Sequence, residues 1–281
     1  MPLSKDAPAT VEITEACRPW RQGDLALQEH WFAHACEPSK PLTVAAEQES
    51  GEGVAVVESV VEGLMVVTQT CDVLRNCVDR PYVEVCPLIA VDSDKLEEVK
   101  KLRRPSLATL EVLASQGLVV DLDRVMTVEK SVLASWKRTP GCANEAEASQ
   151  LASALSRKRS RFAFPDDFRD FVEKLVGRIK DKHGKESPEG EALRALVEIR
   201  VAALPSWRAV PATLMFWFIR ADDDTVLTGE LGAEMLKRWL KLMPATECFS
   251  EPEGQLTRLQ DMTAEEYCGS ERLDLDHLSH S

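Results

Sequence analysis

The sequence predicts an α+β protein. Short runs of β-branched and apolar residues, bounded by turn-forming or charged residues, recur through the first half, as at 54–61 and 64–68. Apolar residues at helical spacing mark the second half, most clearly over 166–179. With 281 residues and 44% hydrophobic content, the chain is long enough for one large domain or two ordinary ones.

The most compact apolar run, residues 64–68, is expected to be a buried central strand. It starts after Gly63 and ends where the polar stretch 69–72 begins. Functional side chains are often placed where a regular element gives way to a loop. We therefore expect any site in the first half to lie at the end of this strand.

The remaining elements of the first half follow from turn residues and periodicity. Before the central strand, the prediction is a short strand after a turn at 23–24, a loop over 30–50 and a strand at 54–61. After the central strand, it is a strand at 82–86 ended by Pro87, a charged helix from Ser93 and a second helical piece ended by Gly117. Strands at 118–122 and 125–135 complete the first half.

The second half is expected to open with a helix or linker at 141–154. A helical hairpin follows, with helices at 166–183 and from Pro188 to about residue 204. A buried strand at 213–219, a turn, a returning strand at 225–228 and a helix at 232–243 complete it. The predicted domains are residues 18–140, residues 150–245 and an acidic C-terminal tail at 246–281, which resembles a tethered strand or a partner-binding tail.

Charge is distributed unevenly along the chain, which carries −13 in total. Residues 1–97 have 7 basic and 17 acidic side chains, residues 98–220 have 22 and 16, and residues 221–281 have 5 and 14. Nucleic-acid binding normally needs a concentrated positive surface, so the first segment is a poor candidate for it and the middle a better one.

The compartment can be predicted from the apolar runs and the cysteines. No run reaches the length of a membrane span, and residues 1–10 lack the order of a signal peptide, so we expect the cytoplasm and no membrane partner. The eight cysteines are scattered and form no CxxC pair, which favours reduced thiols and removes the strongest zinc signature.

Four segments taken together resemble the strand series of the PemK/MazF toxin family. They are GDLAL at 23–27, LMVVTQ at 64–69, YVEVCPL at 82–88 and GLVVDLDRVMTVEKSVL at 117–133. The resemblance covers about the first half of the chain. It implies a small β-barrel over 18–140 with a helical insertion, and a bacterial stress or antiviral-defence locus of the toxin–antitoxin or CRISPR type.

The sequence departs from that family at the positions that cleave RNA. The resemblance calls for Arg-Pro before the second strand, where this chain has residues 62–65 (EGLM), and for Ser or Thr after the Pro of the third strand, where Leu88 follows Pro87. Val132 also stands where the family has a basic residue. We therefore expect a non-catalytic protein-interaction module that needs no cofactor and binds a protein partner, with RNA as the less favoured partner.

Two alternatives assign chemistry to particular residues. An endoribonuclease with a relocated site would use Thr68, Gln69, Thr70, Cys71 and Asp72, or Cys71 could be a nucleophile activated by a histidine. The plainer interpretation is a small buried cysteine followed by a turn-forming aspartate. A zinc site could use His30, His34 and Cys36, whose plainer interpretation is a packed loop.

A basic cluster leads from the middle of the chain into its second half. It consists of Arg157, Lys158, Arg159 and Arg161. Such a cluster can bind phosphates, neutralise the acidic flanks or dock an acidic partner, although solvated helix faces produce the same pattern. Docking of an acidic partner or neutralisation of the flanks is preferred, because it also accounts for the acidity of both ends.

Overall fold

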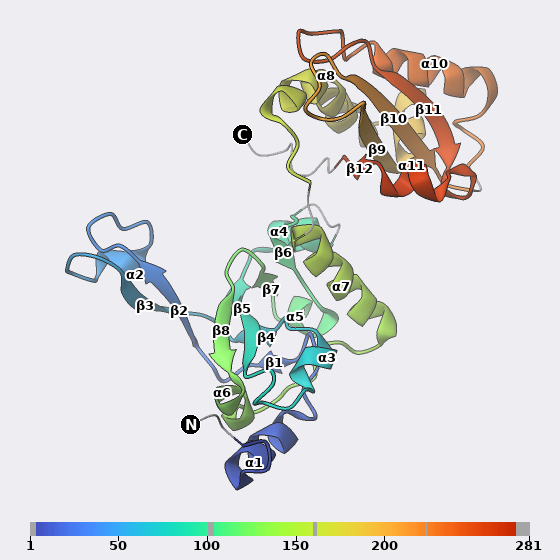
Figure 1. Cartoon of the computed structure of the whole chain (residues 1–281). Helices are drawn as coiled ribbons and strands as arrows, with labels where there is room; N and C mark the ends of the chain where they lie inside the picture. Colours follow the sequence, from blue (N-terminus) through green and yellow to red (C-terminus); the bar gives the residue numbers. More distant parts are fainter. Residues whose placement is uncertain (1–3, 101–103, 160–161, 223, 274–281) are drawn as a thin grey trace. The chain divides into compact units, whose positions relative to one another are not determined.

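A computed structural model describes residues 4–100, 104–159, 162–222 and 224–273 (Figure 1). The chain divides into two compact units, Met1–Arg161 and Phe162–Ser281. Each unit combines helices with a β-sheet, which confirms the α+β class. The boundary lies after residue 161, not between 140 and 150 as the sequence suggested.

The first unit contains fifteen elements in the described ranges. They are α1 (Pro8–Cys17), β1 (Leu25–Ala26), β2 (Trp31–Cys36), α2 (Val44–Glu47), β3 (Ala55–Val60), β4 (Leu64–Val66), α3 (Thr70–Val73), β5 (Tyr82–Ala90), α4 (Ser93–Lys100), β6 (Leu107–Ala108), α5 (Glu111–Ala114), β7 (Leu118–Asp121), β8 (Met126–Glu129), α6 (Lys130–Ser135) and α7 (Glu145–Arg159).

A six-stranded antiparallel sheet organises this unit, in the order β1-β4-β5-β7-β6 with β8 also paired to β5. Alternate residues of β4 and its extension enter two cores. Leu64 and Val66 join the core against α1 and α6, and Met65 and Val67 join the core against α5 and α7. Burial on both faces explains why this strand is a continuous apolar run.

β5 is the longest strand of the sheet and continues through Pro87, which the sequence analysis placed at its end. Leu88 N donates to Gly63 O, so the backbone nitrogen of Pro87 faces the opposite edge. On that edge the pairing with β8 ends at Val85 and the pairing with β7 begins at Leu88. The proline therefore removes no ladder hydrogen bond.

Several expectations for the first unit were wrong. Residues 31–36 are a strand, not a loop, and they pair with β3 in a separate two-stranded sheet. The second helical piece is shortened to α5 because Leu107–Ala108 pairs with β7, and the strand expected at 125–135 becomes α6 after Glu129. No pairing among the described strands closes the six-stranded sheet into a barrel.

The second unit surrounds one four-stranded sheet, in the order β11-β10-β9-β12. Its elements are α8 (Asp166–His183), α9 (Pro188–Arg194), β9 (Leu196–Leu204), β10 (Thr213–Arg220), α10 (Gly229–Leu240), β11 (Glu253–Arg258), the short 3-10 helix Leu259–Asp261, α11 (Ala264–Cys268) and β12 (Glu271–Arg272). Apolar faces of α8 and α10 form the core together with β9 and β10.

The expected helical hairpin was wrong, because the second helix stops at Arg194. Residues 196–204 instead form β9, whose antiparallel pairing with β10 places Ile199, Val201 and Ala203 in the core. The returning strand expected at 225–228 is absent from the described residues, since β9 takes that place beside β10. The segment after 246 contributes β11 and β12 to the same sheet, and residues 274–281 lie outside the described ranges.

Candidate functional site

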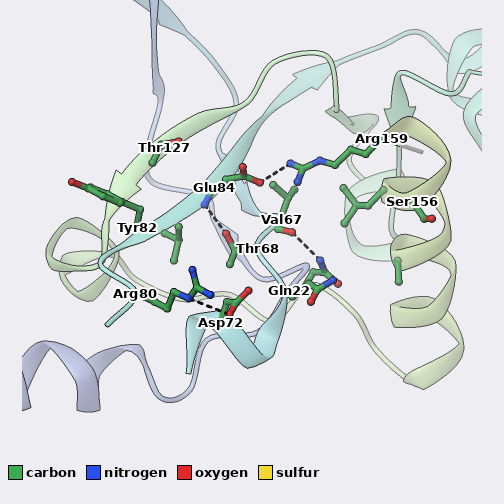
Figure 2. A pocket seen from close by; sticks show the side chains of 14 residues that line it. Gln22, Val67, Thr68, Asp72, Arg80, Tyr82, Glu84, Thr127, Ser156 and Arg159 are labelled. Carbon is green, nitrogen blue, oxygen red and sulfur yellow. Dashed lines mark hydrogen bonds and ion pairs between the residues drawn. The ribbon is translucent and has the colours of Figure 1, made fainter. Parts of the chain in front are cut away.

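A pocket of about 690 Å³ lies at the end of β4, where the sequence predicted a site (Figure 2). Three of the five residues named for a relocated site line it, namely Thr68, Gln69 and Asp72, whereas Thr70 and Cys71 do not. The other walls come from the start of β5 and from one face of α7. The strand end is thus a wall of a real pocket built from segments far apart in the sequence.

Hydrogen bonds from two sides hold the Val67–Thr70 segment in place. Glu84 N donates to Thr68 Oγ1 at 2.6 Å, and Val67 N donates to Glu84 O at 3.0 Å. On the other side, Gln22 Nε2 donates to Val67 O at 2.8 Å and Gln22 N donates to Thr70 Oγ1 at 3.1 Å. The backbone at Val67 and the side chains of Thr68 and Thr70 are therefore held in place before any ligand binds.

A buried lysine supports the short helix α3 that carries Asp72. Lys130 is 1% exposed, and its Nζ donates to Asp72 O at 2.9 Å and to Arg75 O at 2.7 Å. Asp72 O lies in the last turn of α3 and also accepts from Arg75 N at 3.4 Å, and Arg75 O lies just past the end of the helix. The lysine therefore ties the end of α3 and the following turn to the interior. Burial lowers the pKa of Lys130. The sequence analysis missed this residue, although a lone lysine within the apolar-patterned segment 126–133 was an available signal.

Charged groups in the pocket meet in opposite-sign pairs. Arg159 Nη2 lies 2.6 Å from Glu84 Oε2, and Arg80 Nε lies 3.8 Å from Asp72 Oδ1 (Figure 2). Tyr82 also lines the pocket and is 58% exposed. Two guanidinium groups, two carboxylates and an open aromatic ring make a site for a polar ligand chain.

The sequence analysis missed the residues that β5 contributes. Tyr82 and Glu84 alternate with the buried Val83 and Val85, and this period of two was the signal that could have found them. Gln22 and Arg80 have no comparable local signal, because a turn and a loop carry them to the pocket.

Cys71 is not part of the pocket and is not buried. Its side chain is exposed, with Sγ 3.7 Å from Gln69 Oε1. His30 Nδ1 lies 3.2 Å from Val61 O, and His34 Nε2 lies 3.4 Å from Thr43 Oγ1. The alternative of a Cys71–histidine pair gains no support, because the hydrogen bonds of His30, His34 and Cys71 go to other groups. The plainer interpretation of Cys71 as a buried residue is wrong, since its side chain is exposed.

The zinc hypothesis is also contradicted. His34 and Cys36 lie in β2 and His30 directly precedes it, so the three residues are on a strand and not on a helix face. Within the described ranges, no three His, Cys, Asp or Glu side chains come together as a metal site would require. Nδ1 of His34 is buried without a hydrogen-bond partner.

The basic cluster lies at the C-terminal end of α7 and is partly neutralised within the first unit. Arg159 pairs with Glu84 at the pocket, and Lys158 pairs with Asp123. Arg157 occupies the same helical turn, and Arg161 lies outside the described residues. The contacts therefore show that Arg159 and Lys158 neutralise acidic side chains of their own unit.

A second feature of the first unit is the hairpin arm, which we define as residues 31–60. Its strands β2 and β3 extend away from the six-stranded sheet, with α2 in the connection between them (Figure 1). Val57 is buried at 3% exposure, whereas Val56 is 73% and Val60 is 90% exposed. Side chains therefore alternate between a covered face and an open one.

The open face of the arm is largely apolar. Across it Trp31 pairs with Val60, Ala33 with Glu58 and Ala35 with Val56. Trp31 and Ala33 are partly buried against the core of the first unit, so the large exposed apolar side chains of this face are those of β3. In the connection, Leu42 is 97% and Val44 is 71% exposed. Single exposed apolar residues are ordinary on a protein surface, but clusters of this kind mark interaction sites.

Comparison of the chain with models of known protein families and with curated proteins finds no match. In the described part of the chain, no helix combines the length and the apolar character that crossing a membrane requires.

Proposed function

We propose that this protein is a protein-interaction module whose partner binds the hairpin arm. One observation carries the proposal: Val56 and Val60 lie on the open face of a projecting two-stranded hairpin at 73% and 90% exposure. Isolated two-stranded hairpins are marginally stable in water. Covering a valine side chain completely contributes roughly 1.5–3 kcal/mol, so a partner on this face would gain binding energy and also stabilise the arm.

The scaffold under the arm is proposed to be a toxin-like fold of the PemK/MazF type, with the six-stranded sheet in place of a closed barrel. The order of the segments GDLAL, LMVVTQ, YVEVCPL and GLVVDLDRVMTVEKSVL supports this assignment. The bacterial stress or defence setting follows from the same resemblance. At the positions where the family cleaves RNA, this chain has EGLM before Val66 and Leu88 after Pro87. These residues favour binding over catalysis.

The test is capture of a partner from an extract of the cells that make the protein. The tagged full-length chain is compared with the double variant Val56→Lys/Val60→Lys and with Val210→Lys. Val210 is the matched control, because it is also 73% exposed but belongs to the second unit. We expect the wild type and the control to retain one partner in stoichiometric amount and the double variant to lose it. Equal capture by all three proteins, or by none, would reject the proposal.

A second candidate function is RNA cleavage in the pocket. The observation that favours it is the exposed Tyr82 beside Arg80 and Arg159, since aromatic rings stack on bases and guanidinium groups bind phosphates. Asp72 or Glu84 would take the proton of the attacking 2′-hydroxyl. Both carboxylates already form ion pairs with arginines, which makes them less available as bases and ranks this function second.

RNA cleavage is tested with the wild type, Asp72→Ala and Arg159→Ala, with and without divalent metal. Lys158→Ala is the control, because Lys158 is the neighbour of Arg159 on α7 but does not line the pocket. An active site predicts cleavage by the wild type and the control and its loss in the two pocket variants. Intact RNA with every preparation would eliminate this function.

A further inference from the structure

We infer that the partner docks on the hairpin arm through a basic β-strand, which adds to the outer edge of β3. The inference rests on the proposed function and names the chemistry of the partner. It follows from three properties of the arm: an open backbone edge, an apolar face at the same residues, and a surplus of negative charge.

Hydrogen bonding shows which backbone groups of β3 face outward. Val61 N donates to His30 O at 3.2 Å, one step beyond the strand pairing of Trp31 with Val60. In an antiparallel pair, residues with backbone groups facing the partner strand alternate with residues whose groups face away. N–H and C=O of Val56, Glu58 and Val60 therefore face the outer edge. Among the described strands, β3 pairs with β2 alone.

The opposite edge of the arm is directed toward the rest of the first unit. Ala33 N, which faces outward from β2 by the same alternation, lies 3.2 Å from Met126 Sδ of β8. The two edges of the arm therefore differ, and β3 carries the one that no described strand pairs with. Exposed edges of this kind are templates for strand addition.

The residues with outward-facing backbone groups also carry the exposed side chains. Val56 and Val60 present apolar groups on either side of Glu58, all on the open face of the arm. A strand added at this edge would place every second side chain beside these three. The matching sequence has apolar residues opposite the valines and a cation near Glu58.

The charge of the arm selects the partner. Residues 31–60 contain five glutamates (Glu37, Glu47, Glu49, Glu52 and Glu58) and one lysine (Lys40), a formal charge of −4. In the described structure, no ion pair joins these glutamates to a basic side chain of the chain itself. Two arms paired edge to edge would bring −4 against −4, so charge disfavours a second copy and favours a strand that carries lysine or arginine.

The probe is a fluorescent octapeptide of the pattern Val-Thr-Lys-Thr-Val-Thr-Lys-Thr, in which valine and lysine alternate along one face and threonine fills the other. It is titrated with the full-length protein and followed by anisotropy. Its counterpart carries glutamate in place of lysine. We expect the basic peptide to bind, its affinity to fall as salt rises, and the acidic peptide not to bind. Equal binding of the two peptides, or no binding of either, would overturn the inference.

Substitutions at Glu58 separate charge from backbone pairing. Glu58→Gln removes the negative charge of the side chain. Glu58→Pro removes that charge and also the backbone N–H of residue 58, which faces the outer edge and is not bonded to β2. Loss of one docking hydrogen bond is expected to weaken binding by about fivefold beyond Glu58→Gln. Glu58→Lys should abolish binding, while Glu230→Lys, the same charge change on α10 of the second unit, should leave it unchanged. Equal affinity of Glu58→Pro and Glu58→Gln would exclude strand addition.

Sedimentation velocity of the free protein tests the alternative occupant. A dimer that strengthens with concentration and is lost in Glu58→Pro would assign the edge to a second copy and overturn the inference. If neither peptide binds but Val56→Lys/Val60→Lys still abolishes partner capture, the proposed function stands and the strand chemistry fails. If partner capture also survives those two substitutions, both fail.

Discussion

The side-chain nitrogen of Lys130 lies 2.9 Å from the carbonyl oxygen of Asp72, in the interior of the first unit. This contact joins the start of α6 to the short helix α3, whose Asp72 side chain lines the pocket. One buried lysine thereby supports the backbone that positions the predicted site.

Replacement of Lys130 by methionine is expected to destabilise the first unit. The variant keeps the apolar stem but removes the two hydrogen bonds from Lys130 to the carbonyls of Asp72 and Arg75, at a cost of about 2–3 kcal/mol in the free energy of unfolding. Urea unfolding of the full-length protein measures the change. Lys137→Met, at an exposed position, should shift it by less than about 0.5 kcal/mol. A similarly small effect of Lys130→Met would show that water replaces the lysine.

The buried carboxylate of Asp24 ties the start of β1 to the segment after α6. It accepts hydrogen bonds from Arg21 N at 2.6 Å, from Arg138 Nε at 2.6 Å and from Gly141 N at 3.4 Å. Asp24→Ala leaves these donors unpaired, and we expect a loss of about 3 kcal/mol. Because Arg138→Met removes part of the same network, the double variant should lose clearly less than the two single losses added. Simple additivity would mean that the two residues act independently.

A paired carboxylate in the second unit predicts a pH dependence of stability. Arg178 donates to Glu189 at 3.0 and 2.6 Å, and these hydrogen bonds hold the pKa of Glu189 below its usual 4.5. A lowered folded-state pKa adds stability above the unfolded-state pKa, and this stability is lost as pH falls through the folded-state value. Glu189→Gln should therefore cost about 2 kcal/mol at pH 7, and the difference from wild type should shrink progressively below pH 4.5.

The control for this measurement is Glu234→Gln, which breaks an exposed ion pair with Arg238 on α10. Glu234→Gln should change the free energy of unfolding by no more than about 0.5 kcal/mol, both at pH 7 and below pH 4.5. A pH-independent effect of Glu189→Gln would show that packing, not charge, accounts for its contribution.

The cysteines should differ sharply in reactivity. Burial raises the pKa of Cys17 to about 11 and that of Cys86 to about 12, whereas Cys71 and Cys268 are exposed. Since the thiolate is the reactive form, an aromatic disulfide reagent at pH 8 should label the exposed pair first and Cys17 and Cys86 only after unfolding. Mass spectrometry of digests identifies each labelled site. Labelling of Cys86 as fast as Cys71 in the folded protein would contradict the burial of Cys86.

Local sequence was sufficient for the strands that are buried on both faces. The segments that became β4, β7 and β10 contain consecutive apolar residues, a pattern that fits a strand covered on both faces with little help from distant contacts. The same reasoning placed Thr68, Gln69 and Asp72 at a strand end, where the pocket lies.

Partner strands decided the elements whose local pattern is ambiguous. The spacing of Leu193, Leu196 and Val197 fits one face of a helix. Pairing with β10 instead makes residues 196–204 the strand β9 and buries Ile199 and Val201. A longer helix would not place these two side chains on the same face. Residues 31–36 become a strand because residues 55–60 return alongside them.

The sequence by itself therefore determined the α+β class, the doubly buried strands, the long amphipathic helix α8 and the pocket-lining segment that follows β4. Tertiary structure alone decided the hairpin arm, the support of α3 by Lys130 and the convergence of Gln22, Arg80 and Arg159 on one pocket. The physical reason is that burial periodicity is a local property of the chain. Strand pairing, ion pairing and the capping of a helix end by a distant side chain depend on contacts between remote segments, and no local pattern specifies them.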